Sequence, residues 1–249
     1  MRAILTYHSL DDSGSPISVA PAVFRRQVAW LGSGRVRVVP LAELLALPPA
    51  ADAVAITFDD AFLNFVEVAA PLLAERRLPV TLFVVPGHVG KDNAWGGLRS
   101  ARVPTLPLAD WAALGRLVEE GVTLGAHTRT HPHLTRLADA ALAEELGGAQ
   151  ESIRRETGQP AAEVAYPYGD GDARVFAAAA AWYRLGVTTE LRGLAVADQP
   201  LALPRLDMFY LRHPGQLEAW GSARFAGRLW LRAQARKLRS TLATVGGGW

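Results

Sequence analysis

Short apolar runs alternate with longer segments of helical periodicity along most of the 249-residue chain. Runs that are apolar at consecutive positions are typical of strands buried on both faces. The pattern predicts strands over residues 3–7, 36–39, 53–58, 79–85, 122–126, 163–166, 185–188 and 201–206. It predicts helices over residues 21–31, 62–77, 108–120, 138–157 and 172–181.

Buried strands separated by helices indicate an α/β fold in which helices cover a mostly parallel sheet. Such a sheet closes as a (β/α) barrel or opens as a doubly wound sheet. In both, ligands bind beyond the carboxyl ends of the strands. We find no internal repeat or linker, so we expect a single domain, with the barrel over residues 1–213 and a C-terminal helical extension over 214–249.

Polar side chains follow four of the predicted strands at the point where each strand ends. Because the carboxyl ends of parallel strands open on one face, we expect these side chains to meet in one pocket. They are His8, the pair Asp59 and Asp60, the pair His127 and His131, and the segment Tyr166-Pro167-Tyr168-Gly169.

Two histidines and one carboxylate are sufficient ligands for zinc or a similar divalent ion. Such an ion activates a water molecule and polarises a carbonyl, while a second carboxylate takes the proton from the water. Asp59 and Asp60 can divide these roles because adjacent side chains of an extended backbone point different ways. The pattern indicates a hydrolase for an amide or ester carbonyl. Taken alone, an aspartate pair also fits a helix N-cap, and two spaced histidines fit a structural turn.

Composition narrows the chemistry further. Hydrophobic residues make up 50% and charged residues 20% of the chain, which is typical of a compact globular protein. The chain has no cysteine, which excludes a disulfide scaffold, a thiol nucleophile and a cysteine-ligated metal. Any metal must therefore be held by His, Asp or Glu. A net charge of +2 gives no indication of a nucleic-acid partner, and we expect none.

The two ends of the chain bear on its location. The N-terminal apolar run is too short for a signal peptide, so we expect a cytoplasmic protein. Residues 222–241 carry basic residues and no acidic ones, which fits either a helix packed on the barrel or one lying on the inner membrane surface. The basic residues are Arg224, Arg228, Arg232, Arg236, Lys237 and Arg239.

Three segments, in this order, resemble the motifs of the polysaccharide deacetylase family (NodB homology domain, carbohydrate esterase family 4). They are Thr57-Phe58-Asp59-Asp60, His127-Thr128-Arg129-Thr130-His131-Pro132 and Tyr166-Pro167-Tyr168-Gly169. The opening Leu5-Thr6-Tyr7-His8 is similar to the start of the exopolysaccharide deacetylase branch. The resemblance spans about residues 3–206 and implies a distorted (β/α) barrel of about seven parallel strands.

The resemblance also implies roles for the site residues. Asp59 would be the catalytic base, and the backbone N–H near Tyr168 would stabilise the oxyanion. The metal would be one divalent ion, with zinc preferred and nickel or cobalt as alternatives. Its ligands would be Asp60, His127 and His131.

Other site residues are less closely defined. His8 and His213 are candidates for the catalytic acid, and His8 is preferred because it closes a strand. Candidate substrate contacts are Tyr166, Pro167, His88 and Asp207. For His88 the alternative is an ordinary loop residue, and for Asp207 it is a helix cap.

The chain departs from the family pattern at three places. Ala61 follows the aspartate pair, where the family usually has Gly. Ala165 stands where an Arg usually orients the base, and the last predicted strand has no histidine.

We expect a metal-dependent hydrolase that removes N-acetyl groups from the amino sugars of a polysaccharide or of its lipid-linked precursor. Its partner would be an N-acetylated glycan. The alternatives are a deformylase or other C–N hydrolase acting on a lipid-linked amino sugar, and an inactive carbohydrate-binding relative.

Overall fold

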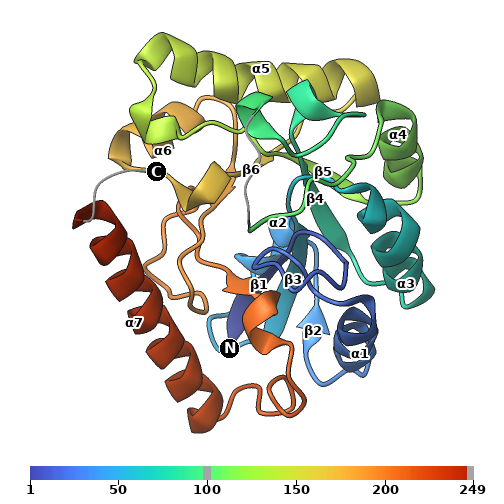
Figure 1. Ribbon diagram of the computed structural model, residues 1–249. Helices are drawn as coiled ribbons and strands as arrows, with labels where there is room; N and C mark the ends of the chain where they lie inside the picture. The colour runs from blue at the N-terminus through green and yellow to red at the C-terminus, as the bar shows by residue number, and fades with distance from the viewer. Residues whose placement is uncertain (98–101, 246–249) are drawn as a thin grey trace.

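The computed structural model describes residues 1–97 and 102–245, without the side chains of 237–245. A sheet of parallel strands forms its centre, in the order β7-β6-β5-β4-β3-β1-β8, with β2 paired to β3 (Figure 1). The strands are β1 (Arg2–Tyr7), β2 (Arg37–Val38), β3 (Ala53–Phe58), β4 (Val80–Val84), β5 (Thr123–Ala126), β6 (Glu163–Ala165), β7 (Leu185–Val187) and β8 (Leu206–Asp207). The seven parallel strands of the main path confirm the predicted distorted barrel.

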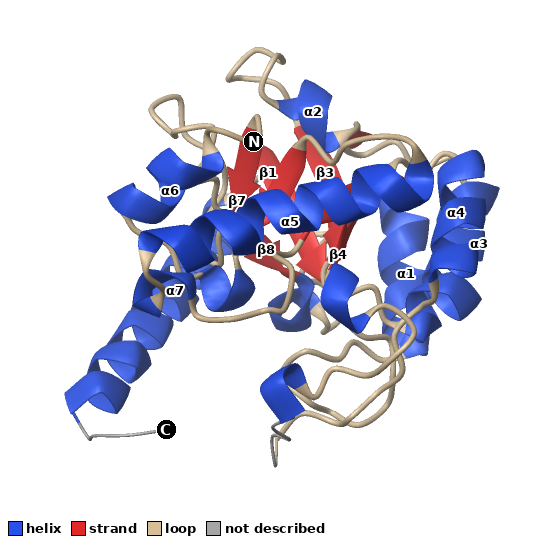
Figure 2. Cartoon of the chain, turned by 90° about the horizontal axis from the view of Figure 1, so that it is seen from above, coloured by secondary structure: helices blue, strands red, loops and turns tan. Residues whose placement is uncertain are grey.

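Helices surround the sheet on its outer side (Figure 2). They are α1 (Pro21–Leu31), α2 (Leu41–Leu44), α3 (Ala70–Glu75), α4 (Trp111–Glu119), α5 (Asp139–Thr157), α6 (Ala173–Ala179) and α7 (Ala223–Val245). Every residue of β1, β3 and β4 is buried, because helices cover one face and barrel side chains fill the other. The consecutive apolar positions of these strands follow from this burial on both faces.

The last strand is shorter than predicted. Only Leu206 and Asp207 pair with β1, although the sequence predicted a strand over 201–206. Pro204 has no N–H to donate, so a regular ladder cannot continue through it. Leu203 instead forms an isolated parallel bridge with Val187 of β7. The segment between Leu203 and Leu206 therefore crosses the gap between β7 and β1, and it carries Arg205 inward.

The helix predicted over 62–77 is present but irregular in its first half. Asp60 and Ala61 have φ values of 71° and 58°, in the left-handed region, so no right-handed helix starts there. A π-helical turn (Phe65–Ala69) precedes α3, and Pro71 lies at the junction, where it lacks the N–H of a regular α-helix. Helix α4 starts at Trp111 rather than at residue 108.

Helix α7 packs along the side of the barrel. Phe225 and Leu229 are buried in the main hydrophobic core. The guanidinium groups of Arg232 and Arg236 lie over the ring of Tyr210, at 4.7 and 5.7 Å from its centroid. Two of the basic residues of segment 222–241 therefore face the body of the protein. The side chains of Lys237 and Arg239 lie outside the described residues. No helix among the described residues is long and apolar enough to cross a membrane.

Candidate metal and catalytic site

Three potential metal ligands meet at the carboxyl ends of the strands. Asp60 follows β3, His127 follows β5, and His131 lies in the loop beyond it. Their ligand atoms all lie within 4.8 Å of one another, and all three residues are buried. The Nε2 atoms of His127 and His131 are 3.5 and 3.6 Å from Asp60 Oδ1. The structure thus brings together the three residues expected to bind metal.

The hydrogen bonding of this cluster fits a divalent cation. His127 donates from Nδ1 to the carbonyl oxygen of Ala165 at 2.8 Å, which leaves the Nε2 lone pair directed at Asp60. Asp60 Oδ1 is buried without a hydrogen-bond partner, a costly state that a bound cation would relieve. Burial also lowers the pKa of His131 well below its usual value, so the imidazole is neutral, as a metal ligand must be. Nitrogen and oxygen donors in this number are typical of zinc.

Asp59 forms a buried bidentate ion pair with Arg205. The Nη1 and Nη2 atoms of Arg205 donate to Oδ1 and Oδ2 of Asp59 at 2.6 and 2.7 Å. Burial alone would raise the pKa of Asp59, but Arg205, with His127 and His8, holds that pKa below its usual range. The carboxylate is therefore ionised at neutral pH. His8 completes this group, with Nε2 at 3.5 Å from Asp59 Oδ2.

Arg205 is the functional residue that the sequence analysis missed. It is fully buried, and it donates from Nη1 to Thr6 Oγ1 and from Nε to the carbonyl oxygen of Thr188, both at 2.9 Å. The sequence pointed to Ala165 as the place of an absent base-orienting arginine; in the structure an arginine reaches Asp59 from the segment before β8 instead. A signal was present, because an arginine between Leu203 and Leu206 in a buried run requires an acidic partner.

The backbone around the site is held in an unusual conformation. Six non-glycine residues of the described chain have positive φ, and five of them belong to the three motifs or adjoin them. Single left-handed residues of this kind cost about 1–3 kcal/mol and cluster at functional sites. One is His131, whose N–H donates to Thr128 Oγ1 at 3.1 Å. The five are Asp60, Ala61, Thr128, His131 and Tyr168.

Aromatic rings form a rim around the metal ligands. Trp95 stacks on the ring of His131 at a centroid distance of 4.4 Å, and Tyr168 meets His131 edge-on at 4.7 Å. His133 also stacks on the ring of Tyr168, at a centroid distance of 4.2 Å. His88 contacts Trp95 edge-on at 4.9 Å, so it is separated from the metal ligands by one ring. Rings of this kind provide surfaces on which a sugar can stack.

Two residues of the third motif are buried. Tyr166 is fully buried and donates from its hydroxyl to the carbonyl oxygen of Leu201 at 2.9 Å. Pro167 is buried as well. The ring of Tyr166 packs in the main hydrophobic core, so its side chain does not have the substrate contact expected from the sequence. The expected contact of Pro167 stays a prediction. Their neighbour Tyr168 is half exposed and carries the ring that contacts His131.

The remaining candidates separate into near and far residues. Asp207 accepts from the N–H of Phe209 at 3.0 Å, which is the capping role that the sequence left open. Burial raises the pKa of Asp207, and the nearby charge of His8 acts against that shift. His213 is exposed in the loop before α7, where its N–H donates to the side chain of Gln216 at 2.9 Å. Of the two candidate acids, only His8 lies beside Asp59.

The family follows from comparison with known proteins. The family model for polysaccharide deacetylase matches residues 46–186, more than half of the chain. The chain therefore belongs to the polysaccharide deacetylase family, whose members are carbohydrate deacetylase hydrolases.

Individual relatives are distant. The protein YxkH of Bacillus subtilis (strain 168) is 26% identical over 202 residues, which cover 79% of this chain and 67% of that one. The poly-β-1,6-N-acetyl-D-glucosamine N-deacetylase of Staphylococcus aureus (strain MSSA476) is 24% identical over 168 residues. That match covers 61% of this chain and about half, 54%, of the relative. The structure of IcaB from Ammonifex degensii has the same fold, with a TM-score of 0.71 and 22% identity over 90% of this chain and 96% of that chain.

Proposed function

We propose that this protein is a metal-dependent N-deacetylase that acts on the amino sugars of a polysaccharide or of its lipid-linked precursor. The observation that carries the proposal is the ligand cluster of Asp60, His127 and His131 beside an ionised, arginine-bound Asp59. Membership of the family supports deacetylation. The name of the relative in S. aureus supports an N-acetylated sugar as the substrate.

The residues around the site divide the chemistry between them. A divalent ion on the three ligands, with zinc preferred over nickel or cobalt, would polarise the acetyl carbonyl and lower the pKa of a water molecule. Asp59 accepts the proton of the attacking water, because Arg205 keeps it ionised and fixes both of its oxygens. A backbone N–H near Tyr168 is our proposed donor to the developing oxyanion.

The leaving amine needs a proton, and we assign this role to His8. Its ring is partly exposed and lies 3.5 Å from Asp59, so it can reach both the base and a bound substrate. In its protonated form it donates to the amine nitrogen as the C–N bond breaks.

The location of the protein stays a prediction, and we propose a cytoplasmic protein that contacts the membrane through α7. Arg224 and Arg228 are exposed on this helix, close to the exposed apolar side chains of Trp230 and Leu231. Basic residues beside exposed apolar ones are typical of helices that lie on anionic membrane surfaces.

Acetate release from N-acetylglucosamine oligosaccharides by the metal-loaded protein tests the proposed function. We expect Asp59→Asn and His8→Ala each to lower kcat by about 100-fold or more, since each removes a proton-transfer group. The matched control is His213→Ala, which should keep full activity. Release of formate from N-formyl sugars, without release of acetate, would identify a deformylase instead. Binding of the sugar by a metal-loaded protein that releases neither acid would identify an inactive relative.

A further inference from the structure

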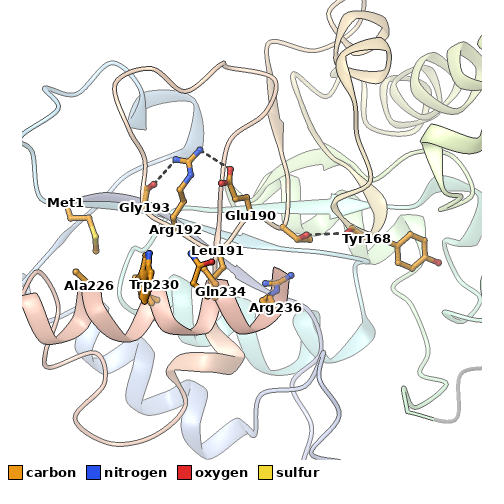
Figure 3. Close-up of a pocket in the computed structure, with 13 residues that line it drawn as sticks. Met1, Tyr168, Glu190, Leu191, Arg192, Gly193, Ala226, Trp230, Gln234 and Arg236 are labelled. Atoms are coloured by element: carbon orange, nitrogen blue, oxygen red, sulfur yellow. Dashed lines mark hydrogen bonds and ion pairs between the residues drawn. The ribbon is translucent and has the colours of Figure 1, made fainter. Parts of the chain in front are cut away.

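A groove of about 590 Å³ runs between α7 and the loop that follows β7 (Figure 3). One wall is the side of α7 that carries Ala226, Trp230 and Arg236, and the other includes Leu191 and Gly193. Its volume lies within the range of about 300–1,000 Å³ that is typical of ligand sites. No step of the proposed reaction uses this groove.

The groove shares one residue, Tyr168, with the surroundings of the metal site. Tyr168 stands at one end of it, with its ring turned away from the groove (Figure 3). That ring contacts the metal ligand His131, while the carbonyl oxygen of Tyr168 accepts from Thr189 Oγ1 in the groove wall at 3.3 Å. One residue, Tyr168, therefore borders both the metal site and the groove.

The polarity of the walls changes along the groove. Gln234 and Arg236 lie toward the Tyr168 end, whereas Met1 and Ala226 lie at the opposite end (Figure 3). Thr189 lies beside Tyr168, because its Oγ1 donates to the carbonyl oxygen of Tyr168. The distant half exposes the thioether of Met1, the methyl group of Ala226 and the indole of Trp230, and it also holds Arg192 and Gly193 (Figure 3). The guanidinium of Arg192 is already paired with Asp198 and Glu190, so few free hydrogen-bonding groups are left there. A hydroxyl-rich sugar chain would lose hydration there without compensation. An apolar chain would gain by leaving water.

Hydrogen bonds within the protein hold the loop side of the groove in place. Arg192 donates to Asp198 at 2.7 and 2.9 Å and to Glu190 at 3.0 Å. The N–H of Leu194 donates to the carbonyl oxygen of Arg2 on β1 at 2.8 Å. A preformed wall lowers the entropy lost when a flexible chain binds against it.

We propose that the groove holds the apolar chain of a glycolipid substrate, with the N-acetylated sugar at the metal site. The chain would run along α7 from Tyr168 toward Met1, and Arg236 would stand near the junction of sugar and chain. This proposal rests on the proposed function and narrows it, because it selects the lipid-linked substrate over the soluble polymer.

The test compares binding of two N-acetylglucosamine glycosides, one methyl and one dodecyl, by calorimetry of the metal-loaded protein below the micelle concentration. We expect the dodecyl glycoside to bind at least about 10-fold more tightly, because several methylene groups leave water. Ala226→Trp puts a large ring into the apolar half and should abolish most of this difference. Ala223→Trp adds the same ring to an exposed position of α7 outside the groove, and it should leave the difference intact.

Equal affinity for the two glycosides would overturn the proposal, and so would a chain-dependent gain that survives in Ala226→Trp. Weaker binding of N-acetylglucosamine oligosaccharides in Ala226→Trp, with the dodecyl glycoside unaffected, would assign the groove to a glycan chain instead. Binding is measured without turnover. A protein that releases no acetate but keeps the chain-dependent gain would contradict the proposed function and leave the groove assignment standing.

Discussion

Two buried carboxylates of the barrel stand in opposite surroundings. Asp59, after β3, has a bidentate arginine and a nearby histidine, so its pKa lies below the usual range although burial acts to raise it. Glu163, at the start of β6, has one hydrogen bond, from Thr81 Oγ1 at 3.2 Å. Burial raises the pKa of Glu163 to about 7.

The difference separates groups arranged for chemistry from a group that the fold tolerates. At the metal site, Asp59 has an arginine partner and Asp60 has a place for a cation. At the other end of β6, Glu163 has no cationic partner among the described residues, so its ionised form opposes folding. Substitutions at the two ends should therefore affect different properties: activity and metal content at one, and stability at the other.

The largest effect is expected at the metal ligands. Asp60→Ala and His127→Ala should lose bound metal and lower deacetylase activity by about 1000-fold or more, since a catalytic metal supplies several kcal/mol of transition-state stabilisation. Elemental analysis of each purified variant, beside acetate release, measures both effects. His133→Ala is the matched control, because its ring lies nearby without facing Asp60. Full metal content in both ligand variants would contradict the assignment of the site.

The next effect concerns the partner of Asp59. Arg205→Met leaves a buried carboxylate without its cation, so we expect the free energy of unfolding to fall by about 3–5 kcal/mol, together with a loss of activity. The double variant Arg205→Met, Asp59→Asn should regain much of the stability but none of the activity. Urea unfolding and acetate release separate the two effects. A double variant as unstable as the single one would show that packing, rather than the ion pair, is what Arg205 provides.

Substitution of Glu163 should raise the free energy of unfolding, whereas substitution of Arg205 should lower it. The folded protein keeps the Glu163 proton up to about pH 7, whereas the unfolded chain releases it near the ordinary glutamate pKa of 4.5, so wild-type stability should fall as pH rises through this window. Glu163→Gln should remove that loss, which adds about 3 kcal/mol at pH 8 and little at pH 4. Urea unfolding at several pH values checks this, with the exposed Glu120→Gln as control. If the stability of Glu163→Gln depended on pH as that of the wild type does, a group other than Glu163 would be responsible for the dependence.

Much of the site was accessible from the sequence because of a simple geometric rule. Strands such as 53–58 and 122–126 are mostly apolar, and in a parallel sheet their carboxyl ends must open on one face. That rule alone brought Asp60 and His127 together. It could not find Arg205, because the pairing of Arg205 with Asp59 joins residues 146 positions apart and depends on how the chain crosses from β7 to β1.

The direction in which side chains point also could not be predicted from the sequence. Tyr166 and Tyr168 belong to one motif, and nothing in their spacing says which of them faces the site. After β6, Tyr166 turns into the core to reach the carbonyl of Leu201. Tyr168 then takes a left-handed φ of 61°, and its ring lies against His131. Which ring turns inward depends on tertiary packing, which a single sequence does not encode locally.

The smallest effect concerns Ala61, where the family usually has Gly. Its φ of 58° explains that preference as one of backbone conformation, since Gly adopts left-handed angles without a steric cost. Ala61→Gly would relieve about 1–2 kcal/mol of strain. It would also remove a buried methyl group, which costs about 0.8 kcal/mol of stability. The greater conformational entropy of the unfolded chain would cost about 0.4–1 kcal/mol more. These terms nearly cancel, so we expect a change of less than about 1 kcal/mol in the free energy of unfolding.

Metal content and acetate release should stay at the wild-type level in Ala61→Gly, because the methyl group of Ala61 is buried and is not a metal ligand. Urea unfolding and elemental analysis of this variant beside Asp60→Ala would therefore compare two adjacent left-handed residues. One carries chemistry in its side chain, and the other contributes only its backbone. A large loss of metal in Ala61→Gly would show instead that the methyl group helps to hold Asp60 in place.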